Sequence, residues 1–170
     1  MMPPIKSLHH WAYRCRDAEA TRYFYEDVLG LPLAHVISED HVPSTGEYSP
    51  YLHIFFEMAD GSYVAFFDLG DGEGTALDPG TPRWVNHLAL EVADEAALIT
   101  AKERLEAQGS DVLGITDHGF VKSIYFFDPN NIRLELTCRI AGKSELAEKA
   151  SQAHARLAEW NRRHGRVAAE

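Results

Sequence analysis

The sequence predicts an α+β protein built from two copies of one β-α-β-β-β module, followed by a C-terminal helix. A short internal repeat is the first observation behind this fold class. Residues 10–17 read HWAYRCRD and residues 87–94 read HLALEVAD, so the pattern His-x-Ala-x-x-x-x-Asp occurs twice. The second observation is that each copy precedes one helical pattern and then three strand-like segments.

The first module covers about residues 5–70. A helix is predicted over residues 18–29, because an acidic cluster opens the segment and Gly30 supplies a C-terminal cap. Strands are predicted over residues 31–37, 51–58 and 62–69, with a turn at Asp60-Gly61. Residues 38–50 are rich in Pro, Gly, Ser and charged side chains and are predicted to form an extra loop.

The second module covers about residues 82–138 and is linked to the first by residues 70–81. Its helix is predicted over residues 95–108 and ends at Gly109. Its strands are predicted over residues 111–116, 123–127 and 132–138, with a turn over residues 128–131. Residues 1–141 therefore form a single domain of two modules.

Residues 142–170 are predicted to form a C-terminal helix and tail. The helix carries an apolar stripe, made of Leu146, Ala150, Ala153, Leu157 and Trp160. We expect this stripe to pack on the body of the protein or on a second subunit.

Composition excludes several classes of function. A formal net charge of -10 argues against nucleic-acid binding, which needs a basic face. No apolar run reaches the roughly 18 residues of a membrane helix, and the N-terminus lacks the apolar run of a secretory signal. The two cysteines, Cys15 and Cys138, are too few for a disulfide scaffold and fall on apolar strand faces, so we interpret them as core residues. A cytoplasmic location is expected.

Three residues point to a metal site. Side chains alternate across a strand, so His10 and His87 begin the polar faces of two equivalent strands, opposite an apolar face in each. Glu135 occupies the polar face of the last strand of the second module. A single strand histidine is usually structural, but two at equivalent repeat positions together with a strand carboxylate favour metal binding.

These residues resemble the vicinal oxygen chelate superfamily, which includes glyoxalase I, fosfomycin-resistance transferases, bleomycin-binding proteins and type I extradiol dioxygenases. The resemblance covers about residues 5–138. It is carried by Leu8-His9-His10 through Asp17, by YFYEDVLGL at residues 23–31, by Asn86-His87, and by Asp128-Pro129 through Glu135. It implies that the two modules form a cup-shaped mixed sheet around one divalent metal ion, with His10, His87 and Glu135 as ligands.

The number of ligands narrows the chemistry that the resemblance implies. Glyoxalase I usually takes one ligand from each of four equivalent strands. Aligning the two turns places Ala65 opposite Glu135, while Asp68 falls three residues later on the other face of a regular strand. Two histidines and one carboxylate with open coordination positions are typical of non-haem Fe(II) oxygenases.

The approach to Glu135 is similar to that of type I extradiol dioxygenases. His118, Tyr125 and Glu135 occupy the matching positions, and Asn131 replaces the usual Gly or Pro at a position whose left-handed conformation Asn tolerates. The resemblance implies that His118 transfers protons and that Tyr125 donates a hydrogen bond to bound substrate. Structural roles in a loop and a strand are the alternatives.

One element of that family's pattern is absent. Two-domain extradiol enzymes carry a further histidine near the position of residues 62–63, where this chain has Ser-Tyr. His53, one strand earlier, is a substitute that matches no motif. The chain also lacks the extra N-terminal pair of modules.

The prediction is therefore a ring-cleaving extradiol dioxygenase that acts on a catechol-type diol with O₂, using Fe(II) as the first choice of metal and Mn(II), Ni(II) or Zn(II) as alternatives. Arg14, His53 and Arg133 are the predicted substrate-binding residues, and a homodimer is expected. One alternative is a non-redox lyase, isomerase or transferase of the glyoxalase or fosfomycin-resistance type at the same metal site. The other is a metal-free small-molecule binding protein of the bleomycin-resistance type.

Overall fold

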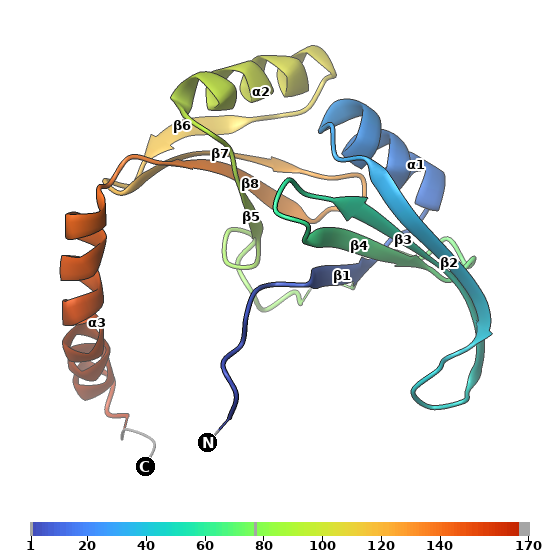
Figure 1. Ribbon diagram of the computed structural model, residues 1–170, viewed down its shortest axis with the longest axis horizontal. Helices are drawn as coiled ribbons and strands as arrows, with labels where there is room; N and C mark the ends of the chain where they lie inside the picture. Colours follow the sequence, from blue (N-terminus) through green and yellow to red (C-terminus); the bar gives the residue numbers. More distant parts are fainter. Residues whose placement is uncertain (1, 77, 167–170) are drawn as a thin grey trace.

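The computed structural model describes residues 2–76 and 78–166 (Figure 1). Residue 77 of the predicted linker and residues 167–170 of the predicted tail lie outside the described residues. The elements of the first module are β1 (His10–Arg14), α1 (Ala18–Arg22), the π-helical segment η1 (Tyr23–Val28), β2 (Leu33–His41), β3 (Tyr48–Glu57) and β4 (Tyr63–Asp68). Those that follow are β5 (Leu88–Glu91), α2 (Glu95–Ala107), β6 (Leu113–Asp117), β7 (Val121–Phe127), β8 (Arg133–Arg139) and α3 (Lys143–Arg163).

The strands form two four-stranded mixed sheets, one from each module. The strand orders are β1-β4-β3-β2 and β5-β8-β7-β6, so the two topologies are the same. In each sheet the first strand pairs in parallel with the last, and the remaining pairs are antiparallel. The predicted α+β class, the repeated module and the C-terminal helix are confirmed.

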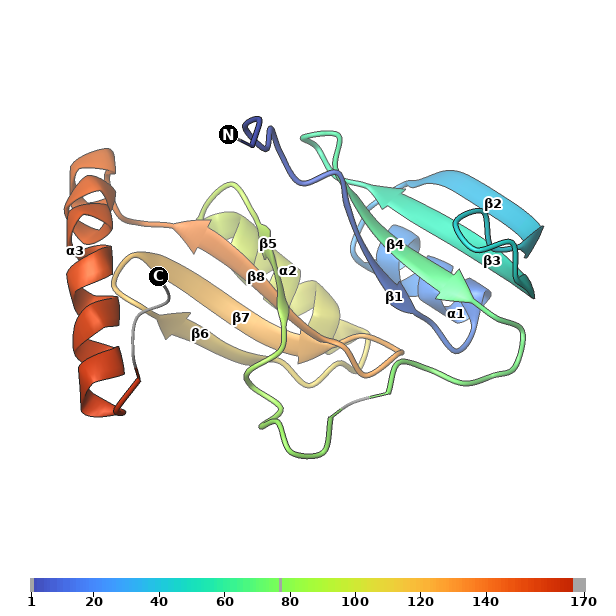
Figure 2. The ribbon, with the colours of Figure 1, turned by 90° about the horizontal axis from the view of Figure 1, so that it is seen from below.

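Both module helices lie on the same side of the sheets, and no helix of the described residues covers the opposite sheet faces (Figures 1 and 2). The apolar strand residues face the helices and form one core that spans both modules, and Phe56, Phe66, Phe126 and Leu134 are among its fully buried members. This arrangement leaves the polar strand faces, which carry His10 and Glu135, on the side away from α1 and α2.

Two boundaries in the first module differ from the prediction. The predicted helix over residues 18–29 changes to π-helical geometry at Tyr23, where the Leu29 amide donates to the Phe24 carbonyl at 2.9 Å. The predicted loop over residues 38–50 is mostly strand, because β2 continues to His41 and β3 begins at Tyr48. Cross-strand pairing extends this hairpin despite its polar composition.

The helix caps follow the sequence closely. Asp17 and Asp94 are equivalent in the repeat, and each accepts a hydrogen bond from the backbone amide three residues later, at 2.9 Å. Gly30 and Gly109 lie at the other ends with φ of 81° and 82°, a left-handed conformation that glycine adopts without strain.

A buried polar network joins the two modules. The Tyr25 hydroxyl donates to Asp128 Oδ2 at 3.1 Å, and Asn130 Nδ2 donates to Thr21 Oγ1 at 3.1 Å. Phe24 packs against Phe126 beside this network, with ring centroids 6.3 Å apart. The first helix of one module therefore holds the turn that precedes β8 of the other.

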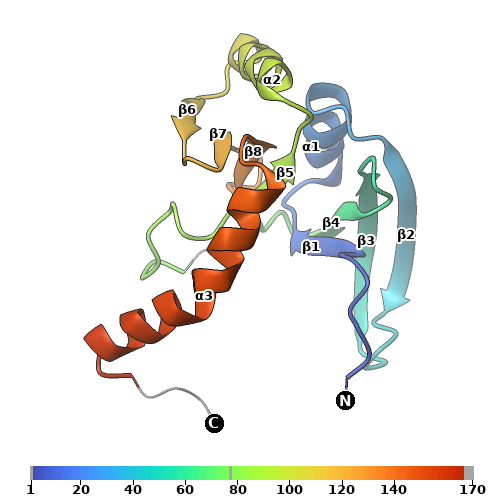
Figure 3. The same ribbon diagram turned by 60° about the vertical axis from the view of Figure 1, so that its left-hand side comes forward.

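The C-terminal helix stands apart from the body (Figures 1 and 3). None of the residues of α3 is buried, and Leu157 and Trp160 of its apolar stripe are 58% and 47% exposed. Of the two expected partners of this stripe, the body of its own chain does not cover it, and packing on a second subunit stays a prediction. None of the helices in the described residues combines the length and apolar character that a membrane crossing needs.

Candidate functional site

The strongest cluster of functional side chains lies on the polar face of the second sheet. His87, just before β5, places Nε2 3.0 Å from Oε2 of Glu135 in β8. The other ring nitrogen, Nδ1, lies 3.0 Å from the Val85 carbonyl, an acceptor, so Nδ1 carries a proton. Nε2 and Oε2 then face each other as two acceptors unless a proton or a metal cation is shared between them.

This geometry fits a metal-binding pair. A neutral imidazole whose Nδ1 donates to a carbonyl presents the Nε2 lone pair, which is the usual arrangement of a histidine ligand. Glu135 is only 6% exposed and is oriented by Ser123, whose Oγ donates to Oε1 at 2.5 Å. A buried, fixed carboxylate beside a partly exposed imidazole offers two ligands of the kind that divalent transition-metal ions take.

The two predicted catalytic residues are in contact beside this pair. His118, which follows β6, places Nε2 2.7 Å from the hydroxyl of Tyr125 in β7. Tyr125 is directly opposite Glu135 in the strand register. Burial, and next the charge of Glu135, raise the pKa of Tyr125, so its phenol stays protonated and acts as a hydrogen-bond donor.

His10 lies elsewhere, on the polar face of the first sheet. Its Nδ1 lies 2.8 Å from Nδ1 of His9, and its ring is 6.2 Å from that of His53 and 5.8 Å from that of Phe55. Within residues 2–76 and 78–166, no group of three or more His, Cys, Asp or Glu side chains is placed to hold a metal ion. The structure therefore brings together His87 and Glu135 but not His10.

The strand directions explain this separation. β1 runs parallel to β4 and β5 runs parallel to β8, and Figure 2 shows β4 and β8 pointing in opposite directions. His10 starts β1 and His87 directly precedes β5, so the two imidazoles lie toward opposite ends of neighbouring edge strands. A repeated motif thus gives equivalent positions that do not meet within this chain.

The fourth equivalent position is occupied by alanine, as the sequence predicts. Ala65 pairs with Ala12, two residues after His10, and Glu135 pairs with Ala89, two residues after His87. Asp68 instead caps α1, because its Oδ2 accepts a hydrogen bond from the Ala18 amide at 2.9 Å. Asp68 therefore has a structural role in this chain.

The predicted substrate-binding residues have structural partners. Arg14 forms an ion pair with Asp71, although its Nε is buried without a hydrogen-bond partner among the described residues. His53 is buried, with Nδ1 2.9 Å from the Phe66 carbonyl, and burial is the main cause that lowers its pKa. Arg133 stacks over the Tyr125 ring at 4.2 Å and donates to the Trp84 carbonyl at 2.6 Å.

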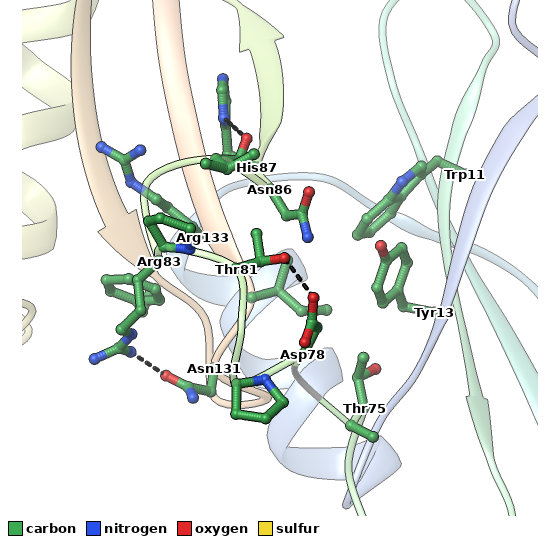
Figure 4. A pocket seen from close by; sticks show the side chains of 16 residues that line it. Trp11, Tyr13, Thr75, Asp78, Thr81, Arg83, Asn86, His87, Asn131 and Arg133 are labelled. Atoms are coloured by element: carbon green, nitrogen blue, oxygen red, sulfur yellow. Dashed lines mark hydrogen bonds between the residues drawn. The ribbon is translucent and has the colours of Figure 1, made fainter.

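A pocket of about 600 Å³ lies between β1 and the segment that leads into β5 (Figure 4). Figure 4 shows Trp11 and Tyr13 on one side and Asn86, His87 and Arg133 on the other. The rings of Trp11 and Tyr13 stack with centroids 4.1 Å apart. Both residues belong to the edge strand β1, where Tyr13 is 36% exposed.

Comparison with known proteins identifies the family. Residues 7–136 match the Glyoxalase/Bleomycin resistance protein/Dioxygenase superfamily. The chain is 30% identical over 135 residues to the uncharacterized protein YwkD of Bacillus subtilis (strain 168), which covers 78% of this chain and 96% of that protein. The chain therefore belongs to this superfamily.

Solved structures share the fold. The glyoxylase/bleomycin resistance protein/dioxygenase domain from Frankia sp. EAN1pec has a TM-score of 0.65 at 18% identity, over 81% of this chain and 100% of that one. TnmS3, an antibiotic binding protein from Streptomyces sp. CB03234, has a TM-score of 0.55 at 18% identity, over 82% of this chain and 100% of that one. The family description itself names glyoxalases and dioxygenases, which are enzymes, beside bleomycin resistance proteins, so membership alone does not fix an activity.

Proposed function

We propose that the protein is a metal-dependent, ring-cleaving dioxygenase that acts on a catechol-type diol with O₂. The observation that carries this proposal is the adjacency of two pairs on one sheet face. His87 and Glu135, 3.0 Å apart, offer metal ligands, and Tyr125, opposite Glu135 in register, joins them to His118 at 2.7 Å. Diol oxidation uses a metal ion to hold the reactants and nearby groups to move protons, and the two pairs of side chains offer these two functions next to each other.

The third ligand is His10, supplied by a second copy of the chain. His10 is kept from the other two ligands within one chain by its place on the first sheet. In a two-fold symmetric dimer each His10 can meet the His87–Glu135 pair of its partner, which gives two equivalent sites. A homodimer of this kind supplies two imidazoles and one carboxylate at each site.

The bound metal, with Fe(II) as the first choice, would hold the diol and activate O₂. The chain supplies orientation and proton transfer. Tyr125 stays protonated and can donate to a substrate oxygen, while His118 can take a proton from the substrate or return one to it. Arg133, stacked on Tyr125, keeps positive charge beside an anionic substrate.

Oxygen consumption tests this proposal. The protein is loaded with Fe(II) without air, mixed with catechols carrying several ring substituents, and exposed to O₂. O₂ uptake with coloured ring-cleavage products is expected, and the Glu135→Gln variant should lose both. His154→Ala, in the exposed helix α3, is the control variant and should retain them.

Two other outcomes would contradict the proposal. Activity with Mn(II), Ni(II) or Zn(II) and no O₂ uptake would indicate a non-redox lyase, isomerase or transferase. Less than one metal ion per several chains, in protein purified without chelators, would indicate a protein that binds small molecules without metal.

The pocket beside β1 supports the small-molecule binding protein as a second candidate. The stacked Trp11–Tyr13 pair offers an aromatic surface, and a structural relative, TnmS3, binds an antibiotic. In that case flat aromatic compounds should quench Trp11 fluorescence in the metal-free protein, and Tyr13→Ala should weaken their binding. Quenching that requires metal would exclude this candidate.

A further inference from the structure

Ser123 is a buried serine in the middle of β7, next to the Glu135 carboxylate. Its exposure is 0%, and its Oγ donates to Oε1 of Glu135 at 2.5 Å. The Oγ also lies 3.1 Å from Oγ1 of Thr137, which in turn is 3.3 Å from the Lys122 carbonyl. Ser123 has one proton, and its short contact with Glu135 is the donated bond, while the single hydroxyl proton of Thr137 is donated to the Lys122 carbonyl.

The two oxygens of Glu135 consequently face different groups. Oε1 is held by Ser123, and Oε2 is directed at Nε2 of His87. A hydrogen bond from a hydroxyl to a carboxylate is among the stronger kinds, and its burial shields it from competition with water. The carboxylate is therefore fixed with one oxygen engaged by the protein and one available.

We propose that Ser123 is a positioning residue that makes Glu135 a one-oxygen ligand of the metal, through Oε2. This inference rests on the proposed metal site. A carboxylate that binds with both oxygens would occupy one further coordination position. By engaging Oε1, Ser123 keeps that position open for a diol, which needs two adjacent positions.

Ser123→Ala tests this role, because it removes only the hydroxyl. Thr137→Val is the matched control: it removes a hydroxyl from the same network that makes no hydrogen bond to Glu135 among the described residues. Co(II) is the probe, since the intensity of its visible absorption depends on coordination number. Thermal unfolding of the metal-free variants checks folding.

The expected result is a loss of about 10- to 100-fold in Co(II) affinity for Ser123→Ala, the usual effect of removing a group that orients a ligand. Its absorption should also change in intensity, because Glu135 becomes free to bind with both oxygens. Thr137→Val should bind Co(II) as the wild type does. A change in coordination number would not follow from a purely structural role of Ser123.

If the wild type binds Co(II) and Ser123→Ala binds it with the same affinity and the same absorption, the proposed role of Ser123 is overturned and the metal site is not. Absence of Co(II) binding by the wild type would overturn the proposed metal site and this inference with it. If Ser123→Ala does not fold, infrared spectra of the wild type with and without Co(II), assigned with Glu135→Gln, decide the question. Carboxylate bands of two-oxygen binding would overturn the inference, and bands of one-oxygen binding would support it.

Discussion

Removing the hydroxyl of Tyr25 tests the network that joins the two modules. The Tyr25 side chain is fully buried, and its hydroxyl donates to Oδ2 of Asp128 at 3.1 Å. Asp128 has other donors in place: the amide and Nδ2 of Asn130 and the amide of Ile132. The Tyr25→Phe variant therefore removes one hydrogen bond without leaving the carboxyl group unpartnered.

The size of the effect follows from these contacts. A hydrogen bond to a charged group contributes about 1.5–3 kcal/mol, and the three remaining donors put Tyr25→Phe at the lower end, about 1.5 kcal/mol. For a chain of 170 residues, about 2–4 °C of Tm corresponds to each kcal/mol, so Tm should fall by about 3–6 °C. Asp128→Ala removes the acceptor of four hydrogen bonds, from Tyr25, Asn130 and Ile132, and should cost about 3–5 kcal/mol.

Urea unfolding followed by circular dichroism measures both variants. Tyr48→Phe is the control, because Tyr48 is 69% exposed in the β2–β3 hairpin, and it should unfold like the wild type. Equal stability of Tyr25→Phe and the wild type, or a smaller loss for Asp128→Ala than for Tyr25→Phe, would refute the assignment of this network to the junction between the modules.

Three further predictions concern the thiols, the proton-transferring pair and the C-terminal helix. Burial is the main cause that raises the pKa of Cys15 from 9.0 to about 11, so the unfolded chain loses this proton at a lower pH than the folded protein. The free energy of unfolding should therefore fall as pH rises from about 9 to about 11, by at most about 1.4 kcal/mol per pH unit. Cys15→Ala should lack this fall in urea titrations, and the same pH dependence in the variant and the wild type would contradict the argument. His118→Ala should lower kcat of ring cleavage by about 10²- to 10⁴-fold with unchanged Co(II) affinity, and an unchanged kcat would exclude His118 from proton transfer. A chain ending at Gly142, without α3, should lose less than about 1 kcal/mol of stability in urea, because no residue of α3 is buried; a larger loss would show that α3 packs on the protein.

Local features of the fold could be predicted because they depend on residues close in sequence. The His-x-Ala-x-x-x-x-Asp repeat identified two equivalent modules, and in both copies its Asp caps the following helix. Asn131 was expected to tolerate a left-handed turn and has φ of 64°. The π-helical segment after Arg22 was not predicted, because no residue type marks the point where the hydrogen bonds of a helix change from four to five residues apart.

The site could be predicted within one sheet but not between sheets. Strand alternation and pairing place Glu135, Tyr125 and Ser123 on one face, and the contacts of Glu135 with His87 and of Tyr125 with His118 follow from short-range geometry. The position of His10 depends on how two sheets pack against each other, which alternation does not encode. Ser123 was missed because a serine on a polar strand face is ordinary until its burial is known.

Mixing two variants tests the shared metal site most directly. His10→Ala and Glu135→Ala each damage every site of their own dimers. After 1:1 mixing and subunit exchange, about half of the dimers contain one chain of each variant. If each metal site is built from two chains, one of the two sites in a mixed dimer has all of its ligands, so about one metal site in four is intact. Recovery of Co(II) binding to about a quarter of the wild-type level is the expected result, and no recovery after confirmed exchange would contradict a site that takes His10 from a second copy.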